Sequence, residues 1–369
     1  MAGLNFRNIS RPLEDGHRFS GFNLEIDDGE FVALVGRSGC GKAELIRMAE
    51  GYGGYYEGEV LINDRRVTRF GRGGNSASMI NEIPLMGTPR REIMHMLKQQ
   101  VSLDEAAARV DSAARDTGAE GIMDVRWSKL DPEGRLRAGM ARAQALKAKV
   151  VLLIDPFEEM DDRTAARMRV EVMEFHKRTR TAFVIATSSH ITGMALATRV
   201  VVLDGGSIRQ SDTPQNIYDY PADRFVAEYF GDVAINMIPA ELRQNGDEVY
   251  AVFGGNRILV PNGKLSKLVD QSYIGKKVLM GIRPENIRYE QAFISISPES
   301  AVEARVRHAE LLGSETYLHL SMEGVKGDVV ARVDPRCIAS SGISMSLAID
   351  SNRLHFFDID TEKSIMSRL

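Results

Sequence analysis

The sequence lacks the features of a secreted or membrane-spanning chain. No uninterrupted apolar run in its 369 residues approaches the roughly 18 residues of a membrane span, and the polar start MAGLNFRNISRP has no signal-peptide core. The two cysteines, Cys40 and Cys337, lie far apart and the seven histidines are scattered, so no spacing is typical of a metal site made of side chains alone. A net charge of -4 argues against electrostatic binding of nucleic acid or anionic lipid. We therefore expect a globular cytoplasmic protein that reaches a membrane only through other proteins.

What the sequence does contain is a change of pattern near residue 232. With 43% apolar and 27% charged residues, the chain is long enough for about two or three packed domains. Up to that point buried strand patterns alternate with helical patterns, which predicts an α/β layer structure with a mainly parallel sheet. A helical insert is expected over about residues 85–150, where Ser102 and Glu105 have capping-box spacing. From residue 233 to 369 short alternating runs such as EVYAVF and TYLHLSM predict a small all-β barrel or sandwich.

The first chemical motif is GRSGCGKA, which follows the apolar run EFVALV and precedes a helical pattern. Its spacing is that of a phosphate loop, in which glycines let backbone N–H groups converge on phosphate and a lysine adds a point charge. One element is missing, because the position after the lysine is alanine where a serine or threonine hydroxyl would bind magnesium. The candidate nucleotide-binding residues are Gly36, Arg37, Ser38, Gly39, Cys40, Gly41, Lys42 and Ala43.

Several segments together resemble a known family. GFNLEIDDGEFVALVGRSGCGK, TPQNIYDYPADRFVAEYFG, MGIRPENI and RLHFFD are similar to the ATP-binding subunits of bacterial carbohydrate-import ABC transporters of the maltose and glycerol-3-phosphate type. The resemblance covers nearly the whole chain. It implies an ABC nucleotide-binding domain over residues 1–232 and an OB-like TOBE domain over 233–369. It also implies a dimer in which ATP lies between one subunit's phosphate loop and the other's signature loop.

Compared with that family, the signature loop has changed. LDPEGRLRAGMARA stands where LSGGQ followed by arginine is expected, so Asp131, Pro132 and Glu133 replace the Ser-Gly-Gly that contacts the γ-phosphate across the dimer. An anion a few ångströms from a phosphate costs about 1 to 4 kcal/mol per charge before metal and water screen it. We therefore expect this loop to repel nucleotide.

The catalytic strand has changed as well. Asp155 matches the aspartate that holds magnesium, but Pro156 follows it directly, where the family has the glutamate that activates water. Loss of a positioned general base costs about 10²- to 10⁴-fold in rate. Glu158 and Glu159 are possible substitutes, although they fall beyond the proline and are more readily read as solvated loop acids. Asp161 matches the aspartate of the loop that contacts the partner subunit.

Further positions depart from the family in the same direction. Ser188 stands where a histidine steadies the γ-phosphate, and His190, two residues on, is a possible substitute. The glutamine that senses magnesium and the permease falls at Asn81, or in another alignment at Glu82. No Tyr or Phe stands near Leu13, where the family stacks an aromatic ring on adenine, and Phe19 is expected to belong to the core.

These departures predict a catalytically degenerate subunit. Lys42, the loop glycines and Asp155 retain the means to hold ATP, with magnesium bound weakly or with help from a partner. We expect ATPase activity of the assembled complex, which would contain a second ABC ATPase subunit, two permeases and an extracytoplasmic substrate-binding protein, at the cytoplasmic face of the membrane. Whether this chain is itself an enzyme stays open. Two alternatives are an ordinary homodimeric transport ATPase with shifted catalytic residues and a soluble regulator; the transported sugar or polyol is not readable from the sequence.

Overall fold

The computed structural model describes residues 2–14, 16–68, 77–81, 87–98, 100–266, 268, 271–337 and 339–366. Its contacts divide the chain into two compact units, Met1–Gln215 and Asn216–Leu369. The candidate Glu82 lies outside the described residues. Within those that are described, none of the helices has the length and apolar character needed to cross a membrane.

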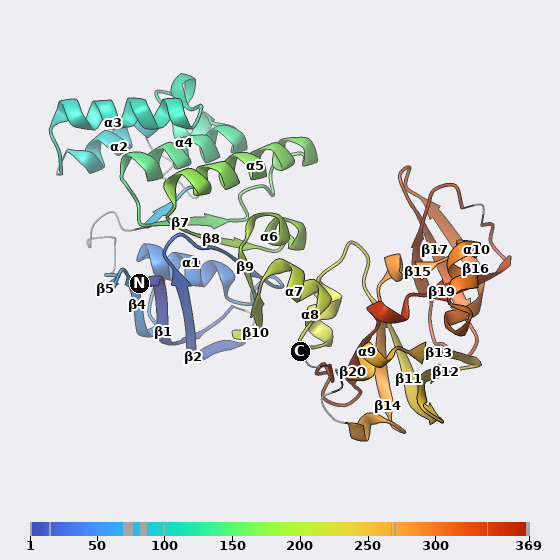
Figure 1. The fold of residues 1–369 in the computed structure, drawn as a ribbon. Helices are drawn as coiled ribbons and strands as arrows, with labels where there is room; N and C mark the ends of the chain where they lie inside the picture. The colour runs from blue at the N-terminus through green and yellow to red at the C-terminus, as the bar shows by residue number, and fades with distance from the viewer. Residues whose placement is uncertain are drawn as a thin grey trace. The chain divides into compact units, whose positions relative to one another are not determined.

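The first unit is built around a six-stranded sheet (Figure 1). Neighbouring strands in this sheet are parallel except at one edge, where the outermost strand pairs antiparallel with the next. The predicted mainly parallel sheet is therefore confirmed. The strands follow the order β10 (Ser207–Asp212), β9 (Arg199–Asp204), β3 (Phe31–Val35), β8 (Ala182–Thr187), β7 (Val150–Ile154) and β6 (Ala77–Met79).

Helices cover both faces of this sheet. On β8 the ring of Phe183 lies 5.8 Å from that of Phe175 of α5 (Asp162–Thr179), whereas the next residue, Val184, belongs to the core that contains Leu45 of α1 (Lys42–Glu50). Successive strand residues point to opposite faces, so α1 and α5 lie on opposite sides of the sheet. Burial on both faces explains why these strands are continuous apolar runs.

A second, antiparallel sheet closes the core on the α1 side. Leu4, Phe6 and Ile26 of this sheet are fully buried and share one apolar cluster with α1 and the parallel sheet. Phe19 is fully buried in the same cluster, which confirms it as a core residue. The strand order is β2 (Arg18–Asp27), β1 (Ala2–Pro12), β4 (Glu57–Ile62) and β5 (Arg65–Arg66).

The helical insert contains α2 (Pro89–Leu97), α3 (Leu103–Asp116) and α4 (Pro132–Ala145), which lie together in Figure 1. Ser102 caps α3 by accepting a hydrogen bond of 3.2 Å from the Glu105 amide, as the sequence predicts. Glu92 of α2 ties the insert together. It accepts hydrogen bonds from the Trp127 indole at 2.7 Å and from the Arg142 guanidinium of α4 at 2.9 Å.

The second unit consists of two five-stranded antiparallel sheets with short helices. The two strand-like runs named in the sequence, EVYAVF and TYLHLSM, both form strands, so the predicted β architecture is confirmed. One sheet has the order β13 (Asn256–Val260), β12 (Glu248–Phe253), β11 (Asn236–Asn245), β14 (Lys277–Ile282) and β20 (His355–Asp358). The other has β15 (Ile287–Arg288), β19 (Ser344–Ile349), β16 (Ala301–Leu311), β17 (Thr316–Met322) and β18 (Val329–Val333). Its helices are α8 (Arg224–Tyr229), α9 (Asn262–Leu265) and α10 (Gln291–Ile296), and α7 (Pro214–Asp219) spans the boundary between the units.

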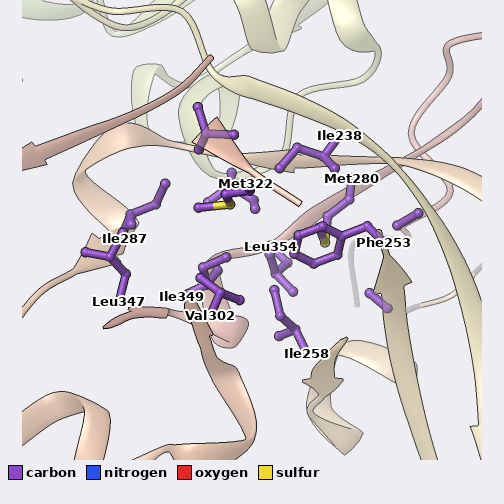
Figure 2. Close-up of a cluster of buried hydrophobic side chains, with 14 of the residues drawn as sticks. Ile238, Phe253, Ile258, Met280, Ile287, Val302, Met322, Leu347, Ile349 and Leu354 are labelled. Atoms are coloured by element: carbon purple, nitrogen blue, oxygen red, sulfur yellow. The ribbon is translucent and has the colours of Figure 1, made fainter. Parts of the chain in front are cut away.

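Both sheets of the second unit contribute to one core. Figure 2 shows Ile238, Phe253 and Met280 of the first sheet around the same apolar centre as Val302 and Ile349 of the second. Each of these side chains is at most 3% exposed. The two sheets therefore fold as a single unit.

One buried arginine attaches α7 and α8 to this unit. Arg283 is 2% exposed and follows β14 directly. Its guanidinium donates hydrogen bonds to the carbonyl oxygens of Phe230 at 2.5 Å and Tyr218 at 3.0 Å, and it lies 3.6 Å from the centre of the Tyr218 ring. The stretch 216–232 thus packs with the β-rich unit, although the sequence pattern groups it with the α/β part.

Candidate nucleotide site

The phosphate loop joins β3 to α1, as the sequence predicts. Gly39 and Gly41 have φ angles of 82° and 105°, which L side chains rarely adopt. A Cβ added at Gly36 would lie 2.2 Å from the carbonyl oxygen of Leu203, and one added at Gly41 would lie 2.3 Å from the Phe19 ring. Glycine is therefore required at these positions for the loop to pass so close to its neighbours.

Lys42 lies at the start of α1 with its ammonium group inside the loop. It is 6% exposed and donates hydrogen bonds to the carbonyl oxygens of Gly36 at 2.6 Å and Arg37 at 2.9 Å. The N-cap residue of α1, Gly41, provides no side-chain cap for the first-turn amides. Amides without a cap and a lysine at a helix N-terminus fit a phosphate group.

Cys40 is a buried residue of the loop, and burial keeps its thiol from acting as a nucleophile. Its thiol is 2% exposed and lies 3.7 Å from the Lys42 ammonium group. Burial raises the pKa of this thiol, although Lys42 opposes the shift. The thiol form therefore predominates at neutral pH, and Cys40 fills space in the loop.

Asp155 is held at the carboxyl end of β7 in a constrained conformation. Its φ angle of 38° is in the left-handed region, which aspartate tolerates better than most residues. Its amide donates to the carbonyl oxygen of Ala186 at 2.8 Å, and its carboxylate accepts a hydrogen bond from the Ser188 amide at 3.1 Å. The structure thus brings Asp155 and Ser188 together, as two candidates of one site.

The possible substitutes for the missing glutamate are placed differently. Pro156 is buried, whereas Glu158 and Glu159 are exposed. The Glu159 carboxylate lies 3.5 Å from the guanidinium of Arg135. His190 begins the short helix α6 (His190–Leu196) and has an interaction partner of its own. The catalytic roles of Glu158, Glu159 and His190 stay predictions.

The altered signature loop forms the start of α4. The Asp131 carboxylate accepts a hydrogen bond of 2.7 Å from the Gly134 amide, and Pro132 occupies the first turn. This is a favourable helix start, because aspartate is among the best N-cap residues and proline suits the first helical position. The signature sequence has therefore changed while the helix that it begins is kept.

Glu133 is neutralised by basic side chains. Its carboxylate lies 2.5 Å from the guanidinium of Arg167 on α5 and 3.2 Å from that of Arg137, which in turn lies 2.7 Å from the Glu171 carboxylate. These pairs connect α4 to α5. The repulsion of a nucleotide that the sequence predicts for two acids is consequently reduced, because the charge of Glu133 is balanced by two arginines. The remaining negative charge is that of Asp131.

Asn81 and Asp161 both have local structural partners. The Asn81 amide accepts a hydrogen bond from the Ile154 amide at 2.9 Å and donates to the Ile154 carbonyl oxygen, so it extends the pairing of β6 with β7. Asp161 caps α5 by accepting from the Thr164 amide at 3.0 Å, and hydrogen bonds from Thr164 lower the pKa of its carboxyl. Magnesium binding by Asn81 and a dimer contact by Asp161 stay predictions.

The site lacks an aromatic ring at the position expected to stack on adenine and a hydroxyl at the position expected to bind magnesium. Leu13, at the position expected for the adenine-stacking residue, is 7% exposed and belongs to the core. Ala43 offers no ligand to a metal. In the described part of the chain, no group of three or more His, Cys, Asp or Glu side chains is placed to hold a metal ion. The residues fit a phosphate well and a magnesium ion only through Asp155 and the phosphates themselves.

One charged residue next to the phosphate loop gives almost no signal in the sequence. Glu44 stands in the first turn of α1 and is 9% exposed. The only signal for it in the sequence is an acid directly before the apolar residues Leu45 and Ile46 of KAELIRMAE.

Comparison with known proteins gives three family matches along the chain. The ABC transporter model matches residues 19–158, the MalK OB fold domain matches 234–287, and the TOBE domain matches 280–357.

Similar proteins extend over almost the whole chain. It is 32% identical to the oligosaccharides import ATP-binding protein MsmX of Bacillus subtilis over 93% of this chain and 94% of that protein. It is 32% identical to the sulfoquinovosyl glycerol transport ATP-binding protein SmoE of Agrobacterium fabrum over 99% and 100%. It is 30% identical to the sn-glycerol-3-phosphate import ATP-binding protein UgpC of Shigella sonnei over 99% and 100%. Among solved structures, cbiO1 from Clostridium perfringens matches with a TM-score of 0.51 and 21% identity over 58% of this chain and 90% of that one, which supports the fold.

Proposed function

Because this chain belongs to the family of ATP-binding subunits of carbohydrate-import ABC transporters, we propose that it is the catalytically degenerate member of a heterodimeric ATPase pair. The family has the fold that binds ATP, typically with magnesium. The proposal adds that this chain binds ATP weakly and does not activate water itself.

The surroundings of Asp155 carry the proposal. Pro156, buried directly after it, leaves no carboxylate beside the residue that would hold the metal. Ser188, which replaces the γ-phosphate histidine, uses its amide to bind the Asp155 carboxylate at 3.1 Å. A site without a base loses about 10²- to 10⁴-fold in rate. A metal bound at Asp155 would therefore organise a site that cannot activate water.

A heterodimeric pair would contain two unequal nucleotide sites. One uses this chain's phosphate loop, Ala43 and Asp155, and lacks a base. The other uses the partner's phosphate loop, base and histidine, and meets Asp131 and Glu133 of this chain. Because Glu133 is already paired with Arg167 and Arg137, the second site loses less. Turnover is proposed to occur there, at a reduced rate.

The proposed cargo is a sugar, a polyol or a sugar phosphate, since the similar proteins are named for the import of oligosaccharides, a sulfoquinovosyl glycerol and glycerol-3-phosphate. The proposed partners are two permease subunits, an extracytoplasmic substrate-binding protein and the second ATPase subunit. Attachment to the cytoplasmic face of the membrane would run through the permeases.

Purification of the complex from its native host tests the pair. The tagged full-length chain should bring down two permeases and a second, homologous ATPase subunit that has a glutamate directly after its metal-binding aspartate. Mass spectrometry identifies the subunits, and released nucleotide is quantified. A complex in which this chain is the sole ATPase subunit, and which hydrolyses ATP, would instead support the homodimer with shifted residues.

A further inference from the structure

A cavity in the first unit lies at the edge of the parallel sheet that β6 forms. It has a volume of about 420 Å³, which is within the range of small-molecule sites, and all three residues of β6 line it. The end of α1 lines one side, and residues of α2 and α4 line the other. Among its described lining residues none belongs to the phosphate loop, because Glu50 lies about 12 Å along the axis of α1 from Lys42. The cavity is thus separate from the nucleotide site.

Ser78 of β6 contributes a hydroxyl group without a partner. The residue lines the cavity and is 4% exposed, and its buried oxygen forms no hydrogen bond with the described residues. Leaving a buried hydroxyl unpaired costs about 1–3 kcal/mol. A ligand in the cavity that offers a hydroxyl group would remove that cost.

The charged side chains around the cavity balance one another. Arg47 and Glu50 line it from α1, and Glu92 and Arg142 line it from the insert. The Arg142 guanidinium lies 2.9 Å from the Glu92 carboxylate, and the charged pair from α1 has interaction partners as well. An ionic ligand would have to displace an existing partner, whereas hydroxyl groups bond to the donors and acceptors that such partners leave over. The lining therefore favours a neutral ligand.

An aromatic ring adds an apolar wall. Tyr52 lines the cavity and yet is 60% exposed. Its backbone is fixed by the end of α1, because Gly51 has a φ angle of 92° and the Tyr52 amide donates to the Arg47 carbonyl oxygen at 2.8 Å. Met79 and Met96 extend the apolar lining. An apolar wall beside hydroxyl-binding groups fits a sugar ring, which has apolar faces and a rim of hydroxyls.

We propose that this cavity is a regulatory site for a neutral polyhydroxyl compound, a small sugar or polyol. The elements that line it lead to the nucleotide site. Lys42 begins α1, and Asn81, which follows β6, is hydrogen-bonded to the backbone of Ile154 directly before Asp155. Occupancy is therefore linked to ATP binding through α1 and β6. The site lies beyond the proposed function, because a sugar bound there acts on the ATPase subunit itself.

Saturation-transfer NMR of the full-length chain with glucose, sorbitol and maltose tests the proposal. Saturable binding is expected, and Ser78→Ala and Tyr52→Ala should each weaken it by about fivefold or more. Ser78→Ala should not lower thermal stability, because it removes a hydroxyl that has no partner. Tyr55→Ala, a change at a tyrosine that is 75% exposed and does not line the cavity, is the matched control and should leave binding unchanged. Saturating ATP should change the glucose affinity by about fivefold, and glucose should change the ATP affinity by the same factor.

The charge of the ligand gives a second comparison. Glucose 6-phosphate and glucosamine carry the same ring with a negative and a positive charge, and both should bind more weakly than glucose. Tighter binding of either would overturn the neutral class. No saturable binding of any of the three neutral probes, or equal weakening by Tyr55→Ala, would overturn the site.

The regulatory role is tested in the assembled complex. Glucose binding to the free chain that is lost in the complex would assign the cavity to a partner subunit and overturn that role, as would a glucose affinity that ATP leaves unchanged. ATP hydrolysis is measured in the same samples. Hydrolysis by the chain alone would contradict the proposed function and leave the sugar site intact.

Discussion

The start of α4 gives a direct prediction about the altered signature loop. The Asp131 carboxylate accepts a hydrogen bond of 2.7 Å from the Gly134 amide and thereby caps the helix. Replacing such a cap by alanine costs about 1 kcal/mol, whereas serine caps nearly as well. Asp131→Ala should therefore open the first turn of α4 more often, and Asp131→Ser should leave it closed.

Native-state hydrogen exchange at the Gly134 amide measures this locally. A loss of about 1 kcal/mol corresponds to about fivefold faster exchange through local opening. Asp161→Ala, which removes the equivalent cap of α5, is the matched control and should speed exchange at Thr164 and leave Gly134 unaffected. Equal exchange in wild type and Asp131→Ala, or equal acceleration by Asp131→Ser, would refute the cap. The acid at position 131 would then need a role outside the helix.

Two further predictions concern stability. Glu92→Ala should lower the free energy of unfolding of the first unit by about 3 kcal/mol, because the substitution leaves the Arg142 guanidinium buried without its carboxylate partner. Denaturant titration measures this loss, and a loss below about 1 kcal/mol would contradict the prediction. Burial and the nearby Arg283 lower the pKa of His355 from 6.5 to about 3, so it is neutral in the fold while the unfolded chain binds a proton below pH 6.5. Stability from this group is complete above pH 6.5 and lost as the pH falls, by about 3 kcal/mol at pH 4. His355→Gln should lack that part of the pH dependence in thermal unfolding, and an unchanged slope would count against it.

The sequence predicts the parts of the site that depend on local spacing. The phosphate loop, the strand that directly precedes Asp155 and the cap of α3 by Ser102 all follow from residues within a few positions of each other, and all are present. The β architecture after residue 235 follows from alternation and turns in the same way.

The parts that were not predictable depend on partners distant in the chain. The pairing of Glu133 with Arg167, the bond between the Asn81 amide and Ile154, and the link from Arg283 to Phe230 join residues from 34 to 73 positions apart. Glu44 was missed for a different reason. One acid in an amphipathic helix is ordinary in a sequence, and only the burial of its side chain marks it as unusual.

The most direct test of the degenerate-subunit account compares two substitutions in the purified complex at saturating ATP. Asp155→Asn in this chain should leave most of the ATP turnover, because Pro156 already deprives that site of a base. Replacing the partner subunit's catalytic glutamate should lower turnover by about 10²- to 10⁴-fold. The reverse result, with turnover lost in Asp155→Asn and retained in the partner variant, would contradict the account and assign the chemistry to Glu158, Glu159 or His190.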